Sequence, residues 1–163
     1  TDTGYTARKK TSDHGTILVD GRGMGADNRY WIYSGFPDLN IPYSKWTPAK
    51  LEKAYLEKKY AYAMGDFSSV YPEELGRLKI RRHFLATENY QVVYDELSGE
   101  KEHSYTWLMH ADNPFKEDGK ARFVQTTGKA KLTAHILAPG DAKAENAVTV
   151  VYAGTKPDKG KFE

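Results

Sequence analysis

Alternation of apolar and polar residues through the second half of the chain is the feature that most constrains its fold. Leu78, Ile80, Arg82 and Phe84 occupy every second position of residues 78–84, and a second run of strand-forming residues, 90–94, follows Glu88-Asn89. Successive side chains of a β-strand lie on opposite faces, so this period of two predicts strands, and the short polar break between them predicts a β-hairpin.

Further segments have the composition of strands and are separated by residues that favour turns. Asp20-Gly21, Ser98-Gly99 and Thr127-Gly128-Lys129 have typical turn chemistry. Some eight strands are expected, and strands do not alternate with helices as they do in βαβ units. The sequence therefore predicts an all-β antiparallel sandwich or barrel. The additional strands are expected at residues 16–19, 29–33, 59–64, 104–110, 121–126, 130–137 and 147–152.

We expect at most one short helix. Thr47-Pro48 is a favourable N-cap and first-turn pair, and Leu51, Ala54 and Tyr55 follow at helical spacing. The alternative for this stretch is a polar strand that leads into residues 59–64, and we favour the helix. Residues 1–153 are assigned to one domain, and the Lys-, Gly- and Asp-rich residues 154–163 to a frayed tail.

Charge and composition exclude several classes of partner. The 163 residues carry 24 Lys and Arg against 22 Asp and Glu, with both signs interspersed. This balance does not favour nucleic acid or an anionic membrane as a partner. No apolar run is long enough for a membrane helix, and no signal layout is present at the start. Cysteine is absent, which removes disulfides and thiolate metal sites.

The sequence also contains no motif that would supply a complete catalytic site. No Gly-x-Ser-x-Gly nucleophile elbow or phosphate-binding loop occurs, and no two of the five histidines have His-x-His or HExxH spacing. We therefore assign no catalytic residue. His14 is the histidine most suited to a functional role, because it follows Asp13 and precedes Gly15 at the entrance to a strand, with Asp2 a short loop upstream.

Three segments taken together resemble the carboxy-terminal half of heparinase II/III-type polysaccharide lyases. They cover residues 13–23 (DHGTILVDGRG), residues 65–71 (GDFSSVY), and a hairpin series that runs from Arg81-Arg82-His83 through residues 90–97 (YQVVYDEL) to residues 103–110 (HSYTWLMH). The resemblance extends from about residue 2 to residue 140. Each motif is weak alone, and the order of all three is what makes the resemblance specific.

This resemblance implies a β-sandwich that packs, in the whole enzyme, against an upstream α-helical toroid. Such lyases cleave acidic polysaccharides such as glycosaminoglycans or alginate by β-elimination, with most catalytic groups located before the segment that corresponds to residue 1. We therefore expect a periplasmic or secreted domain that is catalytically silent alone. Some members hold a structural zinc, and Asp2 and His14 match two of its three family ligands; an upstream histidine is the third.

Two other functions remain open. A stand-alone carbohydrate-binding module is the main alternative, with Trp31, Trp46 and Trp107 and nearby tyrosines as a stacking platform for sugar rings. The aromatic content of 13% is compatible with this function, although such residues also favour strands and cores. An adhesion or scaffold sandwich without a ligand is the third possibility.

Overall fold

The computed structural model describes residues 8–24, 29–30, 49–111 and 113–146. Over these ranges the chain consists of antiparallel strands joined by turns, with three 3-10 helices of three residues each and no α-helix. The all-β antiparallel fold is therefore confirmed. The chain divides into two compact units, of which the larger comprises residues 8–12 and 16–107 and the smaller includes residues 13–15 and 108–146.

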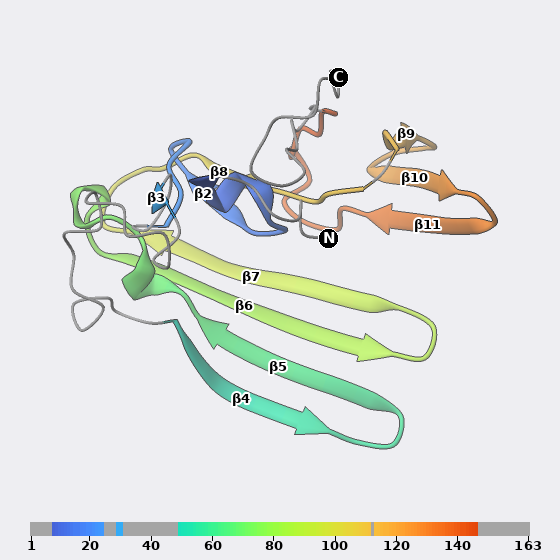
Figure 1. Cartoon of the computed structure of the whole chain (residues 1–163), viewed down its shortest axis with the longest axis horizontal. Helices are drawn as coiled ribbons and strands as arrows, with labels where there is room; N and C mark the ends of the chain where they lie inside the picture. The colour runs from blue at the N-terminus through green and yellow to red at the C-terminus, as the bar shows by residue number, and fades with distance from the viewer. Residues whose placement is uncertain (1–7, 25–28, 31–48, 112, 147–163) are drawn as a thin grey trace. The chain divides into compact units, whose positions relative to one another are not determined.

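The larger unit is built on a four-stranded antiparallel sheet in the order β4–β5–β6–β7 (Figure 1). Two short strand pairs, β1–β3 and β2–β8, accompany it. The bounds in the main sheet are β4 Lys50–Leu56, β5 Tyr60–Asp66, β6 Leu78–Thr87 and β7 Gln91–Gly99. The remaining elements are β1 Arg8–Lys9, η1 Thr11–Asp13, β2 Ile17–Val19, β3 Arg29–Tyr30, η4 Ser68–Val70, η5 Glu73–Leu75 and β8 Tyr105–Trp107.

The core of this unit lies where β2 meets one end of the main sheet. Ile17 and Val19 of β2 pack with Leu78 and Ile80 of β6, and all four are buried. The connection that contains η4 and η5 closes the side of this cluster with further buried residues, Tyr71 and Leu75. Two sheets that bury their facing side chains in this way show the layered packing of a β-sandwich at this end.

Strand register divides the side chains of the main sheet between two faces of different chemistry. We call the face that carries Leu78 and Ile80 the core-side face. Away from the core this face carries Arg82, which opposes Asp95, and then small or apolar residues, because Phe84 opposes Ala63 and Val93. We call the other face the tyrosine face, because His83 on it opposes Met64 and Tyr94, and Leu85 opposes Tyr62. The ladder places Tyr55 beside Tyr62 on the same face.

The smaller unit contains a three-stranded antiparallel sheet in the order β11–β10–β9. Its strands are β9 Lys116–Glu117, β10 Arg122–Thr127 and β11 Ala130–His135. Gly128 has a φ of 58° in the turn between β10 and β11, a conformation that favours glycine. The predicted hairpin across residues 127–129 is thus confirmed. Asn146 adds a loop contact, since its side-chain amide accepts from the backbone N–H of Phe115 and donates to its carbonyl.

The predicted helix after Thr47-Pro48 is wrong for the residues that the structure describes. Residues 50–56 form β4, which pairs along its length with β5 and contains an irregularity between Leu51 and Lys53. The spacing of Leu51, Ala54 and Tyr55 fits a helix, but pairing with β5 supplies the backbone hydrogen bonds and outweighs this weak local preference. The alternative, a polar strand leading into the next one, is the observed structure.

Other predicted strands agree with the structure to different extents. The hairpin of residues 78–94 is present as β6 and β7, with Glu88 and Asn89 in the turn. The strand expected at residues 104–110 is limited to β8, three residues long. Only residues 29–30 of the expected 29–33 strand are described, and the expected strand at 147–152 and the tail 154–163 lie outside the described residues.

Close packing at Gly99 gives a test of the core end of the sheet. A Cβ at Gly99 would lie 2.7 Å from Cδ2 of His103 and 3.2 Å from Cδ2 of Leu78. The His103 side chain is only 3% exposed and has little room to move. We expect Gly99→Ala to lower the free energy of unfolding by about 1–3 kcal/mol in urea denaturation.

Gly140→Ala is the matched control, because a Cβ at Gly140 would meet no atom within 4 Å. It should change stability by less than about 0.5 kcal/mol. Equal effects of the two substitutions would contradict the packing described for Gly99.

Candidate functional site

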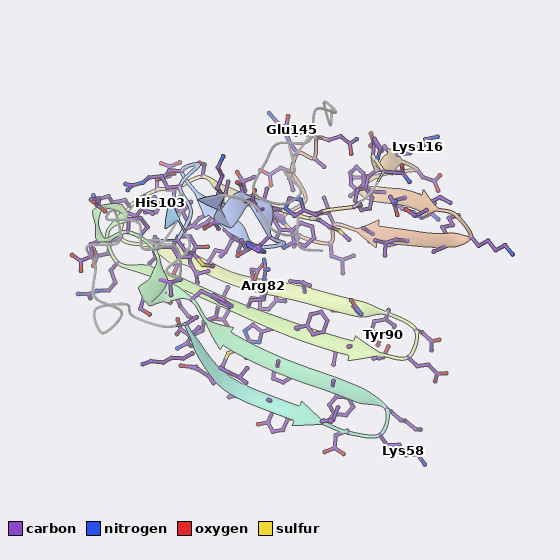
Figure 2. All side chains as sticks on the ribbon, in the orientation of Figure 1. Lys58, Arg82, Tyr90, His103, Lys116 and Glu145 are labelled. Carbon is purple, nitrogen blue, oxygen red and sulfur yellow. The ribbon has the colours of Figure 1, made fainter. Side chains whose placement is uncertain are left out.

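Two adjacent arginines of β6 form ion pairs on opposite faces of the sheet. Arg82 lies on the core-side face, near the middle of β6 (Figure 2), and forms a two-pronged contact with Asp95, with N···O distances of 2.8 and 3.0 Å. Arg81 lies on the tyrosine face and donates to Asp66 at 3.1 Å, with Glu52 at 3.9 Å. These pairs join β6 to both of its neighbours and to β4.

Asp66 also organises the turn that follows β5. Its carboxylate accepts the backbone N–H of Ser68 at 2.9 Å, and the hydroxyl of Ser68 accepts the backbone N–H of Ile80 at 3.0 Å. Burial alone would raise the pKa of Asp66, but the hydrogen bonds from Ser68 and Arg81 outweigh burial and lower it. Asp66 is therefore held as a carboxylate that links a turn to two strands.

Asp20 joins the turn after β2 to the segment before β8. The Asp20-Gly21 turn has φ values of 51° and 71°, and its strand ends exchange both hydrogen bonds between Val19 and Arg22. The Asp20 carboxylate accepts from Nδ1 of His103 at 2.7 Å and from the backbone N–H of Ser104 at 2.8 Å. The hydrogen bond from His103 is the main reason that the pKa of Asp20 is lowered.

Aromatic side chains form a row across all four strands of the tyrosine face. The ring centroids of Tyr55 and Tyr62 are 5.8 Å apart, and the rings are stacked. His83 lies between the next pair, with its ring centroid 6.1 Å from that of Tyr62 and 5.3 Å from that of Tyr94. We call these four residues the aromatic row. One residue comes from each strand, so sheet geometry sets their spacing.

Hydrogen bonds fix the orientation of the central members of the row. Nε2 of His83 lies 3.0 Å from Glu96, and Nδ1 lies 2.8 Å from the hydroxyl of Tyr62. A carboxylate can only accept, so Nε2 donates to Glu96; with a neutral imidazole, Nδ1 then accepts from Tyr62. Lys79 forms an ion pair with the same carboxylate. The hydrogen bond from Lys79, followed by that from His83, lowers the pKa of Glu96.

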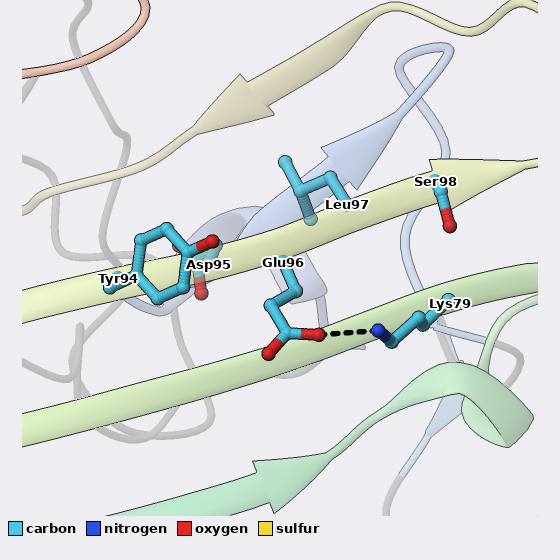
Figure 3. Close-up of a pocket in the computed structure, with 6 residues that line it drawn as sticks. All are labelled: Lys79, Tyr94, Asp95, Glu96, Leu97 and Ser98. Atoms are coloured by element: carbon cyan, nitrogen blue, oxygen red, sulfur yellow. Dashed lines mark ion pairs between the residues drawn. The ribbon is translucent and has the colours of Figure 1, made fainter.

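A hollow of about 410 Å³ adjoins this end of the row (Figure 3). In the close-up the Lys79 ammonium group points at the Glu96 carboxylate, and Tyr94 lies before Glu96 on the same strand. The hollow is open and lies at the β7 edge of the sheet, where Lys79, Tyr94, Glu96 and Ser98 belong to the tyrosine face and Asp95 and Leu97 to the core-side face. Its lining residues are Lys79, Tyr94, Asp95, Glu96, Leu97 and Ser98.

The predicted binding residues are only partly visible. Trp107 lies on β8 and is 47% exposed, whereas Trp31 and Trp46 lie outside the described residues, so a platform of all three stays a prediction. His14 directly follows η1 and is half-buried, and Asp2 lies outside the described ranges. Within those ranges no three His, Asp or Glu side chains are close enough together to hold a metal ion.

The aromatic row cannot be recognised from the sequence patterns described above. Tyr60 and Tyr62 stand in a segment correctly predicted as a strand, but Tyr55 falls in the segment for which the sequence predicts a helix. Recognition of a row needs the pairing register, because Tyr62, His83 and Tyr94 come together only through the ladder. The available signal was the spacing of tyrosines at alternate positions on neighbouring predicted strands.

No family model matches the chain, and no curated protein is significantly similar to it. The resemblance to heparinase II/III-type lyases therefore depends on its three motifs. Along the part of the chain that the structure describes, no helix has the length and apolar character needed to cross a membrane.

Acid should weaken the network around Glu96. Its pKa in the folded protein is lowered from the ordinary value of 4.5. Its charge therefore stabilises the fold above pH 4.5, and this contribution is lost as the pH falls through the lower folded-state pKa. We expect Glu96→Gln to be less stable than the wild type at neutral pH and to lose less stability on acidification, as measured by urea denaturation across this pH range.

Glu57→Gln serves as the control, because Glu57 is an exposed carboxyl in the β4–β5 connection. This variant should keep the wild-type pH dependence. If Glu96→Gln also kept it, the described contacts of Glu96 with Lys79 and His83 would not contribute to stability in solution.

The ion pair between Arg82 and Asp95 gives a second test. Both side chains are less than one-fifth exposed, so a lost partner leaves a poorly solvated charge. We expect Asp95→Asn to reduce the free energy of unfolding by about 2 kcal/mol in urea denaturation. Arg77→Ala removes the exposed pair with Glu100 and should cost less than about 1 kcal/mol. A larger cost for Arg77→Ala would contradict this ranking.

Proposed function

We propose that this chain is the β-sandwich domain of a heparinase II/III-like polysaccharide lyase. The parent enzyme would cleave a uronate-containing acidic polysaccharide by β-elimination, in the periplasm or outside the cell. This domain would support and partly line the cleft, and an upstream α-helical toroid would be its partner in the same parent chain. The domain alone would be catalytically silent.

The observation that carries this proposal is that the three resembling segments contact one another in the folded chain. Asp20 of the first segment binds His103 and Ser104 of the third. Asp66 of the second segment binds Arg81 of the third. Residues that are distant in sequence are therefore coupled in space, which gives a physical reason for the three motifs to occur together and in this order.

A further contact connects the first and second segments. The hydroxyl of Tyr71, at the end of GDFSSVY, donates to the backbone carbonyl of Ile17 at 2.8 Å, and both residues are buried. The motif side chains named here hold turns and strands in place, which is the role of a supporting domain.

β-Elimination requires a base to remove the proton beside the uronate carboxylate, and cationic or hydrogen-bonding groups to neutralise that carboxylate. In the proposed enzyme most of these groups belong to the toroid and to a strand upstream of this chain. In the proposed parent enzyme, Asp2 and His14 would supply two of the three protein ligands of a structural zinc, and an upstream histidine would supply the third.

A carbohydrate-binding module is the second candidate, and the half-exposed ring of Trp107 favours it. The two functions differ in what they require of the parent protein. A module can be joined to any catalytic domain, whereas the lyase domain needs an upstream helical region of several hundred residues. The sequence that precedes this chain in its parent gene distinguishes them.

The decisive experiment is an assay of the complete parent protein and of the 163-residue chain alone, with heparin, heparan sulfate, chondroitin and alginate as substrates. Formation of an unsaturated uronate is followed by its ultraviolet absorbance. We expect product from the parent protein with at least one substrate, and none from the chain alone. Product from the isolated chain, or none from the parent with any of the four substrates, would refute the proposal.

A further inference from the structure

We propose that the aromatic row is a binding surface for a saccharide chain, which lies across the four strands with one sugar unit in the hollow beside Tyr94. This assignment does not depend on the lyase proposal, because it rests on the chemistry of the tyrosine face. It also differs from the tryptophan platform, since none of Trp31, Trp46 and Trp107 belongs to the row.

The first support is the exposure and arrangement of the rings. Tyr55 and Tyr94, at the two ends of the row, are 54% and 59% exposed, and the stacked ring of Tyr62 continues the row inward from Tyr55. Ring centroids along the row lie 5.3 to 6.1 Å apart. Tyr55 and Tyr62 stack on each other, so their facing sides are covered, and the apolar C–H faces of a saccharide chain can stack on the exposed rings of Tyr55 and Tyr94 at the two ends of the row.

The second support is the polar character of the same face. The pairs Lys79–Glu96 and Arg81–Asp66 lie on it, together with the hydroxyl of Tyr62. A protein layer packed here would have to remove these charges from water, at a large desolvation cost. A saccharide can instead satisfy them with its hydroxyls, which both donate and accept hydrogen bonds.

The third support is the contrast with the core-side face. That face continues from the buried core with the Arg82–Asp95 ion pair, whose side chains are less than one-fifth exposed, and then with Ala63, Phe84 and Val93. In a sandwich, one face of each sheet is directed inward and the other outward. Within the larger unit, the tyrosine face is then the one directed away from β2, and a saccharide can contact its exposed rings.

Charge pairing on the tyrosine face predicts how the ligand is recognised. Lys79 is paired with Glu96, and Arg81 with Asp66 and Glu52, so these five residues carry no excess of positive charge. Affinity should therefore come from ring stacking and hydroxyl contacts and change little with salt concentration. Attraction between a cationic patch and an acidic polymer would instead weaken strongly as salt is added.

The test is isothermal titration of the 163-residue chain with three probes: a heparin hexasaccharide, an alginate hexasaccharide and cellohexaose. We expect saturable binding of at least one probe, with a Kd that is similar at low and high salt. Tyr55→Ala and Tyr94→Ala should each raise that Kd by about two- to tenfold, as expected for the loss of one stacking ring. Tyr94→Phe keeps the ring and should bind like the wild type.

Tyr90→Ala is the matched control. Tyr90 is 58% exposed, nearly as much as Tyr94, but it lies next to the β6–β7 turn and outside the row (Figure 2). It should leave the Kd unchanged. The proposal is overturned if no probe binds saturably, if binding disappears at high salt, or if Tyr90→Ala weakens binding as much as Tyr94→Ala.

Failure of this proposal can be separated from failure of the lyase proposal. Elimination by the parent protein without saccharide binding to the row would leave the lyase function standing and make the row a structural feature. Binding that follows the predicted variants, without elimination by the parent protein, would identify a binding module. Thermal unfolding monitored by circular dichroism verifies that each variant is folded.

Discussion

The pairing of β6 with its two neighbours is the constraint on which the larger unit depends. Arg81 and Arg82 are adjacent, so they project to opposite faces, and in the observed register each forms an ion pair with a carboxylate on its own face. A slip of one residue would exchange the faces of every side chain on the slipped strand. It would turn Ile80 away from β2 and expose it, while Arg81 would face the core. Hydrophobic burial and ion pairing therefore favour the same register.

The sequence predicted fold class and hairpins well because these depend on local patterns. Residues 78–94 alternate clearly and contain a turn at Glu88-Asn89, so the β6–β7 hairpin needed no tertiary information. β4 is the contrary case. Its side chains are largely exposed, so no buried face imposes a period of two, and only pairing with β5 makes it a strand. The spacing of apolar residues within this segment then favoured a helix instead of the observed strand.

The candidate site could not be predicted for a related reason. Histidine and tyrosine were recognised as residues of interest, but the network of Tyr62, His83 and Glu96 joins three strands, and its geometry follows from the register. The motif residues were easier to find and have a different role. Asp20, for example, lies in a conspicuous turn, yet its carboxylate is used to hold His103 and Ser104.

The uneven distribution of the core has a consequence for motion. β6 and β7 are packed against β2 at one end, whereas toward the Glu88-Asn89 turn the described contacts are mainly those of the ladder itself. Opening free energies are low where few apolar contacts must be broken. Backbone amides of one and the same strand should therefore differ in hydrogen exchange, slow near Ile80 and fast near Ala86. The sheet would then loosen from its hairpin end while its core end remains closed.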